Sequence, residues 1–404
     1  MYAKQLHHRE IIVDLDQNIN SAEKAAALRA TYRAARQGKG YTRLLSLSSL
    51  ISITMPNGPV NDEGEYVLFS DTGPVPNSSD YTTLVIVHGT SFNSGTFSRL
   101  PSIGSKHGMR TVLFTRRDYR GSSLYSDDDL ALVQGGKKEF LEGVGKDLAH
   151  FLLWFIKSHD IPKASSDKKA GGIALMGWSM GNHVTLSLLG HPDAISKDNV
   201  SILSTPEFLV YCDHYNTDPP FTSLGYPIPT NGYHPFRDPD FTTLEAKVAN
   251  FGIWVSEYYV HPGYDARNLL DLDFRKHGDD PSVKHVTQQE REQMVEKSPV
   301  DRVDLSLVFK MQSELGNQTQ RALFDPELAK TVLPGLPVTF FACKSSNWYC
   351  VYSFFESESR YKKLVSQGDV ARPITFVELP GANHFVHWDN PNQLMDNVKA
   401  ALDR

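Results

Sequence analysis

The stretch Gly172-Ile-Ala-Leu-Met-Gly-Trp-Ser-Met-Gly181 joins a short apolar run to a serine that stands between two glycines. Residues 172–176 predict a buried strand, and the residues after the serine predict a helix. Gly177 and Gly181 leave room for a sharp strand-to-helix reversal, in which side chains on either side of Ser179 would collide. The reversal would lift the Ser179 hydroxyl clear of the sheet, near outward-pointing backbone N–H groups. The stretch therefore predicts an exposed serine nucleophile, although many copies of this pattern are ordinary tight turns.

Apolar strands and amphipathic helices alternate on both sides of this stretch. Strands that alternate with helices indicate a mostly parallel central sheet with helices on both faces, so the expected fold class is α/β. The predicted strands are residues 82–88, 111–115, 207–212, 337–342 and 374–379, and the clearest predicted helices are residues 140–157, 352–365 and 392–402.

The chain has 404 residues, which is more than one compact core usually holds. We therefore expect a large domain with an insertion. The predicted division is an N-terminal extension (1–45) with a helix at 22–36, a first part of the core (46–214), a mainly helical cap (215–332) and a second part of the core (333–404). Near the start of the core, strands at 50–54 and 65–70 are predicted to flank a turn at 56–59.

Composition excludes several classes of partner. The formal net charge is −6 and both signs are scattered along the chain, which argues against nucleic acid. No apolar run approaches the ~18 residues that span a bilayer. Cys212, Cys343 and Cys350 form neither a disulfide framework nor a metal-ligand spacing. We expect a cytoplasmic protein with a small-molecule substrate, no metal and no cofactor, and the sequence does not predict its oligomeric state.

Four motifs occur in a fixed order along the chain. They are His88-Gly-Thr-Ser91, Asp118-Tyr-Arg-Gly-Ser-Ser123, the Gly177–Gly181 stretch and Gly381-Ala-Asn-His-Phe-Val-His-Trp-Asp389. From about residue 50 to the C-terminus, this set resembles the α/β-hydrolase superfamily, in particular serine-nucleophile members with an inserted lid. The resemblance implies the α/β-hydrolase fold, with Ser179 as the catalytic nucleophile.

His384 is the expected base. It follows the last predicted strand, and histidine has a pKa suited to removing a serine proton at neutral pH. The resemblance also implies that the nucleophile, the acid and the histidine come in this order along the chain. His387 is expected to support it, and His183 is expected to pack on its own helix.

The resemblance implies that backbone N–H groups of Thr90 and Met180 stabilise the oxyanion formed in acyl transfer. Ser91 is an alternative second donor. We expect Trp178 and Ser91 to line the substrate pocket. Asp118 and Arg120, from the second motif, are expected to hold their loop rather than to act in catalysis.

The acid is less clear, because residues 342–350 contain no Asp or Glu where many superfamily members carry it. Asp213, near the end of the sixth predicted strand, is the predicted acid, since some members place it there. The alternatives are Asn347 as a neutral orienting residue, Glu207, or an Asp213 that only caps the start of the cap segment.

These residues together predict a serine hydrolase that cleaves an ester or lactone of a small to medium apolar or aromatic compound through an acyl-enzyme. C–C bond hydrolysis, amide hydrolysis and acyl transfer use the same groups. A non-catalytic ligand-binding protein on this scaffold is a further alternative. Ser179 argues against epoxide hydrolases and haloalkane dehalogenases, which need an aspartate at this position.

Overall fold

The computed structural model describes residues 56–404 apart from 200–210, 230–231 and 370, together with residues 3–5 and 11–13. The chain divides into two compact units, 1–52 and 53–404. In the first unit, β1 (Ala3–Gln5) and β2 (Ile11–Val13) pair as antiparallel strands. The predicted helix at 22–36 and the predicted strand at 50–54 lie outside the described residues.

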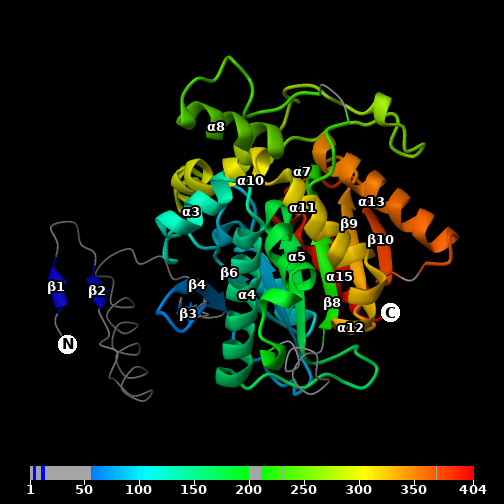
Figure 1. Cartoon of the computed structure of the whole chain (residues 1–404). Helices are drawn as coiled ribbons and strands as arrows, with labels where there is room; N and C mark the ends of the chain where they lie inside the picture. The colour runs from blue at the N-terminus through cyan, green and yellow to red at the C-terminus, as the bar shows by residue number, and fades with distance from the viewer. Residues whose placement is uncertain (1–2, 6–10, 14–55, 200–210, 230–231, 370) are drawn as a thin grey trace. The chain divides into compact units, whose positions relative to one another are not determined.

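The second unit is built on an eight-stranded sheet with the order β10-β9-β8-β7-β5-β6-β4-β3 among the described residues (Figure 1). Its parallel strands are β5 (Thr82–Val87), β6 (Met109–Phe114), β7 (Ile173–Trp178), β8 (Tyr211–Thr217), β9 (Val338–Cys343) and β10 (Ile374–Leu379). At one edge β4 (Tyr66–Asp71) runs antiparallel to both β6 and β3 (Asn57–Pro59). The predicted α/β class with a mostly parallel sheet is confirmed, whereas the turn predicted at 56–59 contributes β3 instead.

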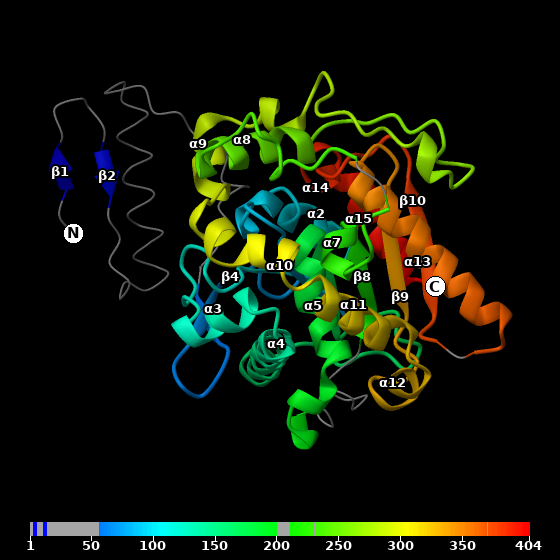
Figure 2. The same cartoon turned by 45° about the horizontal axis from the view of Figure 1, so that its top comes forward.

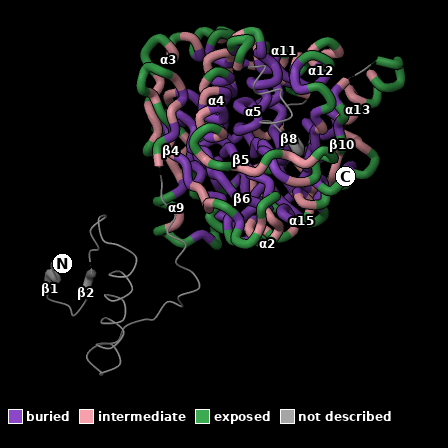
Figure 3. The backbone as a smooth tube through the Cα atoms, turned by 90° about the horizontal axis from the view of Figure 1, so that it is seen from below, coloured by how far each residue is buried: buried purple, intermediate pink, exposed green. Residues whose placement is uncertain are grey.

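Helices cover both faces of this sheet. Successive residues of a strand point to opposite faces, so each strand contributes side chains to both layers of helices. In β6, Phe114 contacts Phe151 of α4 (Lys138–Ser158) with ring centroids 5.0 Å apart. Thr111, three residues earlier, lies against Gly104 of α2 (Pro101–Lys106) on the other face. Helices α5 (Asn182–Gly190) and α13 (Trp348–Ser366) share the α4 face, and α15 (Pro391–Leu402) shares the α2 face (Figure 3). Seen from below in Figure 3, the central strands β5 and β6 are buried.

The segment between β8 and β9 carries several short helices joined by longer irregular stretches (Figure 2). Within the insertion, helical structure is interrupted at residues 295–297, and Pro299 lies in the first turn of the next helical stretch, where a helix tolerates its missing N–H. The helices are α7 (Phe221–Leu224), α8 (Leu244–Val255), α9 (Gln288–Met294), α10 (Leu305–Phe309), α11 (Gln312–Thr319) and α12 (Pro326–Thr331). β8 pairs with β7 and β9 as far as Thr217, and β9 begins at Val338, so the insertion occupies 218–337 instead of 215–332.

The parallel strands bring separate segments of the chain to one edge of the sheet. Their carboxyl ends lie together, which is where open α/β sheets bind ligands. His88 follows β5, Ser179 follows β7, Asp218 follows β8 and the loop with His384 follows β10. The fold therefore collects four polar residues, scattered over 297 positions of sequence (384 − 88 + 1), at the same edge.

Candidate active site

Ser179 stands on a strained turn between β7 and α5. Its φ is 56°, in the left-handed region that residues with a side chain rarely adopt. A Cβ on Gly177 would lie 2.8 Å from the Cα of Asn182, and one on Gly181 would collide with the carbonyl oxygen of Val87. The close approach of these backbones accounts for both glycines, and strain of this kind persists where the surroundings impose it.

The loop after β5 lies directly against this turn. A Cβ on Gly89 would lie 2.7 Å from the Cβ and 3.0 Å from the Oγ of Ser179. The carbonyl of Gly89 accepts hydrogen bonds from Nη1 of Arg116 at 2.9 Å and from Nδ1 of His88 at 3.0 Å. Because the peptide is trans, the N–H of Thr90 points away from that carbonyl. Thr90 lines a cavity together with Ser179 and Met180.

His88 is held in one neutral form. Its Nε2 accepts the N–H of Arg116 at 3.0 Å, so Nδ1 carries the ring proton that bonds Gly89. Burial, followed by the charge of Arg116, lowers the pKa of His88 well below its ordinary value. The imidazole therefore stays neutral and fixes the loop as a donor and an acceptor.

A carboxylate from the insertion holds Arg116. Oδ1 of Asp304 accepts from Nη2 of Arg116 at 2.6 Å, and Oδ2 accepts the hydroxyl of Tyr119 at 2.6 Å. All three side chains are buried. Burial alone would lower the pKa of Arg116, but the Asp304 carboxylate outweighs it and the pKa is raised. Asp304 thus links the insertion to the loop beside Ser179 by a buried, fully paired charge.

Two predicted pocket residues lie elsewhere. The N–H of Ser91 donates to Oη of Tyr119 at 2.8 Å, so it is not free to bind a ligand. Trp178 packs against His384: its Nε1 donates to the carbonyl of His384 at 2.9 Å, and the two ring centroids are 4.8 Å apart. Neither is among the described residues that line the cavity. The pocket predictions for Trp178 and Ser91 are therefore corrected, because both are committed to packing and hydrogen bonds below its surface.

Asp118 and Arg120 hold the loop after β6, as predicted. Oδ1 of Asp118 accepts the N–H of Tyr125 at 2.7 Å, and its Oδ2 accepts Nε of Arg302 at 2.7 Å. The N–H of Arg120 donates to Glu296 at 2.8 Å. Both residues tie this loop to neighbouring segments.

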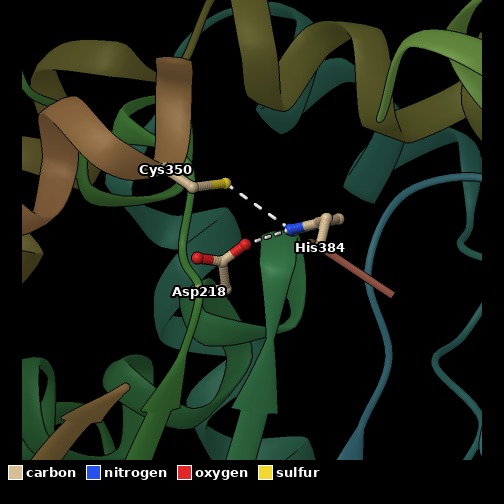
Figure 4. Close-up of side chains that lie close together, drawn as sticks. All are labelled: Asp218, Cys350 and His384. Atoms are coloured by element: carbon tan, nitrogen blue, oxygen red, sulfur yellow. Dashed lines mark hydrogen bonds and ion pairs between the residues drawn. The ribbon is translucent and has the colours of Figure 1, made fainter. Parts of the chain in front are cut away.

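His384 is bonded to a carboxylate through one ring nitrogen only (Figure 4). Its Nδ1 lies 2.6 Å from Oδ2 of Asp218. Asp218 also accepts the hydroxyl of Ser346 at 2.5 Å and the N–H of Cys343 at 3.0 Å. Nε2 of His384 is buried with no hydrogen-bond partner among the described residues, and His384 lines the same cavity as Ser179. A proton on Nδ1 leaves Nε2 as an acceptor within that cavity.

The carboxylate bonded to His384 is therefore Asp218, which corrects the prediction of Asp213. Asp213 lies within β8, and its side chain is not among those described. The strand continues to Thr217, so the first residue past its end is Asp218, with φ of 46°. Asn347 caps α13 by accepting the N–H of Tyr349, and Glu207 lies outside the described residues.

A sequence signal for Asp218 exists in the two prolines that follow it. Proline cannot donate a hydrogen bond inside a central strand. Pro219 and Pro220 therefore set the latest end of β8, and Asp218 is the last residue before them. Arg116, Tyr119 and Asp304 carry no comparable signal in the sequence.

Cys350 is the third group beside the His384 ring (Figure 4). Its Sγ lies 3.5 Å from Nδ1 of His384, and with Asp218 the three side chains offer atoms within 4.8 Å of one another. Oxygen and nitrogen ligands of one tetrahedral zinc ion lie about 3.3 Å apart, given bonds near 2.0–2.1 Å. The 2.6 Å between Asp218 and His384 is a hydrogen-bond distance, so the spacing fits a shared proton better than a metal ion.

Two adjoining cavities lie over the carboxyl edge. The inner cavity, about 30 Å³, is lined by Thr90, Ser179, Met180, Asn347, Cys350 and His384, and by Pro220, Thr222, His234, Pro235, Phe236, Phe251, Trp254, Val255, Val308 and Tyr349. The outer cavity, about 880 Å³, is lined by Phe221, Ile228, Pro229, Gly232, Tyr233, His234, Arg237, Asp238, Pro239, Asp240, Lys276, Trp348 and Tyr349. His234 and Tyr349 border both, and burial together with Arg237 lowers the pKa of His234 to about 4.

A model of the alpha/beta hydrolase family matches residues 84–396, and no curated protein matches the chain. An esterase from Exiguobacterium antarcticum is 12% identical, with 87% of this chain and 100% of that chain covered and a TM-score of 0.47. Epoxide hydrolase A from Mycobacterium thermoresistibile is 14% identical, with 87% and 98% covered and a TM-score of 0.46. The carboxylesterase CesB from Bacillus subtilis is 13% identical, with 94% and 98% covered and a TM-score of 0.43.

Within the described segments, no helix has both the length and the apolar character needed to cross a bilayer.

Proposed function

The chain belongs to the alpha/beta hydrolase family, and from this premise we propose that it is a serine hydrolase that cleaves a small ester or lactone through an acyl-enzyme. One observation carries the proposal. Ser179, on its strained turn, lines the same cavity as His384, whose Nε2 has no partner among the described residues and whose Nδ1 is bonded to Asp218. A nucleophile, a base and an orienting acid in this relation form a catalytic triad.

In the proposed reaction, Ser179 Oγ attacks the carbonyl carbon of the substrate while Nε2 of His384 takes the hydroxyl proton. The imidazole becomes positively charged, and the Asp218 carboxylate stabilises that charge at Nδ1. His384 then gives the proton to the leaving alcohol oxygen, which completes the acyl-enzyme. A water molecule, deprotonated by the same nitrogen, releases the acid and restores Ser179.

The oxyanion is the second charge that the site must stabilise. We assign its donors to the backbone N–H groups of Thr90 and Met180. The support for Thr90 is the orientation of its peptide, since Arg116 and His88 hold the preceding carbonyl on the opposite side. Donors that are fixed before the reaction need no rearrangement when the charge develops, and each can stabilise it by about 3–4 kcal/mol.

The two cavities differ in size, and we assign the acyl part of the ester to one and the alcohol part to the other. The inner cavity is largely apolar and small, which favours a short acyl group beside Ser179. The outer cavity has room for a larger alcohol part. The lack of an acid after β9 favours the alternative of a non-catalytic binding protein, whereas the carboxylate of Asp218 bonded to His384 supports the enzyme.

A fluorophosphonate probe tests the proposal, because it labels only an activated serine. We expect labelling of the wild-type chain and hydrolysis of p-nitrophenyl acetate, and loss of both in Ser179→Ala. Ser91→Ala is the matched control: this nearby buried serine lines neither cavity in the described part of the chain, so labelling should persist. Folded wild-type protein that resists the probe, or Ser179→Ala protein that still reacts, would refute the serine mechanism.

A further inference from the structure

Two residues that line the inner cavity each carry a buried hydrogen-bond donor that has no partner in the part of the chain that the structure describes. The donors are Nε1 of Trp254, in α8 of the insertion, and Oη of Tyr349, in the first turn of α13. Trp254 is 2% exposed and Tyr349 is 5% exposed. A buried donor without an acceptor costs about 1–3 kcal/mol, so two of them on neighbouring residues that border one cavity require a physical reason.

Both rings are fixed by their neighbours. Their centroids are 4.8 Å apart in an edge-to-face arrangement. The ring centroid of Phe251 lies 6.4 Å from that of Trp254, and the ring centroid of Phe221 lies 4.6 Å from that of Tyr349. The backbone carbonyl of Trp254 accepts the hydroxyl of Tyr259 at 3.0 Å. Neither donor can therefore turn to another acceptor without disturbing the packing around it.

The chemistry of the two groups defines what they can bind. An indole N–H can only donate a hydrogen bond. Burial raises the pKa of Tyr349 well above its ordinary value, so its hydroxyl also keeps a proton to donate. Arg237, on the outer cavity, is close enough to oppose this rise in pKa and adds positive potential beside the hydroxyl. The complement of such a pair is an oxygen that accepts hydrogen bonds.

We propose that Trp254 and Tyr349 form a recognition site for an acceptor oxygen on the acyl group of the substrate. The inference rests on the proposed serine mechanism and adds to it a substrate class: short acyl groups that carry an ether, carbonyl or carboxylate oxygen near the scissile carbonyl. Trp254 borders only the inner cavity, and Tyr349 stands where the two cavities meet. The acceptor oxygen therefore belongs to the acyl part, which remains on Ser179, and not to the leaving alcohol.

The test uses two p-nitrophenyl esters of nearly equal size, the methoxyacetate and the butanoate, which differ by an oxygen in place of a methylene group. The ratio of their kcat/KM values is measured in the wild-type protein, in Trp254→Phe and in Tyr349→Phe. The intrinsic reactivity of the esters and any general loss of packing cancel when this ratio is compared between variants. Tyr352→Phe is the matched control on the same helix, because Tyr352 donates to the carbonyl of Pro227 and borders neither cavity.

We expect the methoxyacetate-to-butanoate ratio to fall about threefold to tenfold in each of the two variants, as for the loss of one neutral hydrogen bond. The control should keep the wild-type ratio. An unchanged ratio in both variants, in protein that the fluorophosphonate labels, would overturn this inference and leave the proposed function intact. Lack of labelling would overturn both.

A second pair of substrates tests the placement of the acceptor oxygen. The acetates of methoxyethanol and butanol carry the same difference in the leaving alcohol. We expect both variants to leave the ratio for this pair unchanged. A fall in this ratio alone would contradict the assignment of the two donors to the acyl group.

Discussion

Asp218 and Asp304 are both buried beside the cavity-lining loops, but within the described part of the chain only the Asp304 carboxylate forms an ion pair with an arginine. Asp304 is paired with the guanidinium of Arg116 and with the Tyr119 hydroxyl. Asp218 accepts from the Ser346 hydroxyl, the Cys343 N–H and His384, and no lysine or arginine of the described residues forms an ion pair with it.

The difference separates two tasks of a buried carboxylate. The charge of Asp304 is already neutralised, so its contribution is to hold Arg116, and through it the Gly89 carbonyl, in place. The charge of Asp218 has no cationic partner until a proton reaches His384. On the proposed mechanism, Asp218 therefore acts when charge develops, whereas Asp304 acts by geometry fixed beforehand.

The largest expected effect is that of Asp218→Asn. We expect kcat to fall about 10³- to 10⁴-fold, because the amide neither compensates the imidazolium nor selects the productive tautomer; a serine protease loses about 10⁴-fold on the equivalent change. Steady-state kinetics with p-nitrophenyl acetate measure the loss. Asp213→Asn is the control and should retain nearly wild-type turnover. Equal losses in the two variants would return Asp213 to consideration and remove the contrast with Asp304.

Asp304→Asn should have a smaller effect on turnover and a clear one on stability. We expect kcat to fall about 10- to 100-fold with little change in KM. This loss is smaller than the about 10²- to 10³-fold fall in kcat on complete loss of an oxyanion donor, because the Thr90 N–H is displaced and not removed. Breaking a buried ion pair should also lower the free energy of unfolding by about 3 kcal/mol. Tyr119→Phe keeps the ion pair and should be milder in both measurements. A variant that loses stability but keeps its kcat would reduce Asp304 to a structural role.

A fall in pH should lower the free energy of unfolding through His88 and His183, the two buried histidines near Arg116. Burial, followed by the charge of Arg116, lowers the pKa of His183 to about 3 and that of His88 well below its ordinary value. Unfolded histidine titrates near pH 6.5, so below that pH the unfolded chain binds protons that the folded chain does not. Stability is therefore fully present above about pH 6.5 and is lost as the pH falls.

Urea denaturation at pH 7.5 and pH 5.5 measures this loss, which should be about 1.4 kcal/mol for each of the two histidines. In His183→Gln the drop between the two pH values should shrink by about that amount. Other titrating groups contribute equally to both proteins and cancel in the difference. An unchanged drop would show that His183 is protonated in the folded state.

The smallest expected effect is that of Thr90→Ala. If the oxyanion donor at this position is the backbone N–H, removal of the side chain should change kcat by no more than about threefold. The same p-nitrophenyl acetate assay measures it. A loss as large as that of Asp304→Asn would mean that the threonine side chain, rather than the oriented peptide, supports turnover.

The parts of the molecule that could be predicted are those with local signals. Apolar runs marked the parallel strands, and the glycines around Ser179 marked a reversal whose close contacts the structure displays. Its place after the last strand distinguishes His384 among 15 histidines as the predicted base, and the structure brings it to the cavity that Ser179 lines. The sequence predicts an acid near the end of the sixth strand but points to Asp213 instead of Asp218, since the apolar pattern fades before β8 ends at Thr217.

The sequence by itself determined the α/β class, the order of the motifs and the positions of Ser179 and His384, because each depends on a residue and its near neighbours. Only the tertiary structure decided that Asp218 reaches His384, that Asp304 holds Arg116 from 188 positions away, and that Trp254 meets Tyr349 at the inner cavity. Such pairings depend on strand register and on how the insertion packs over the sheet. The hydrophobic periodicity of the sequence does not predict which segments, far apart in the sequence, come into contact.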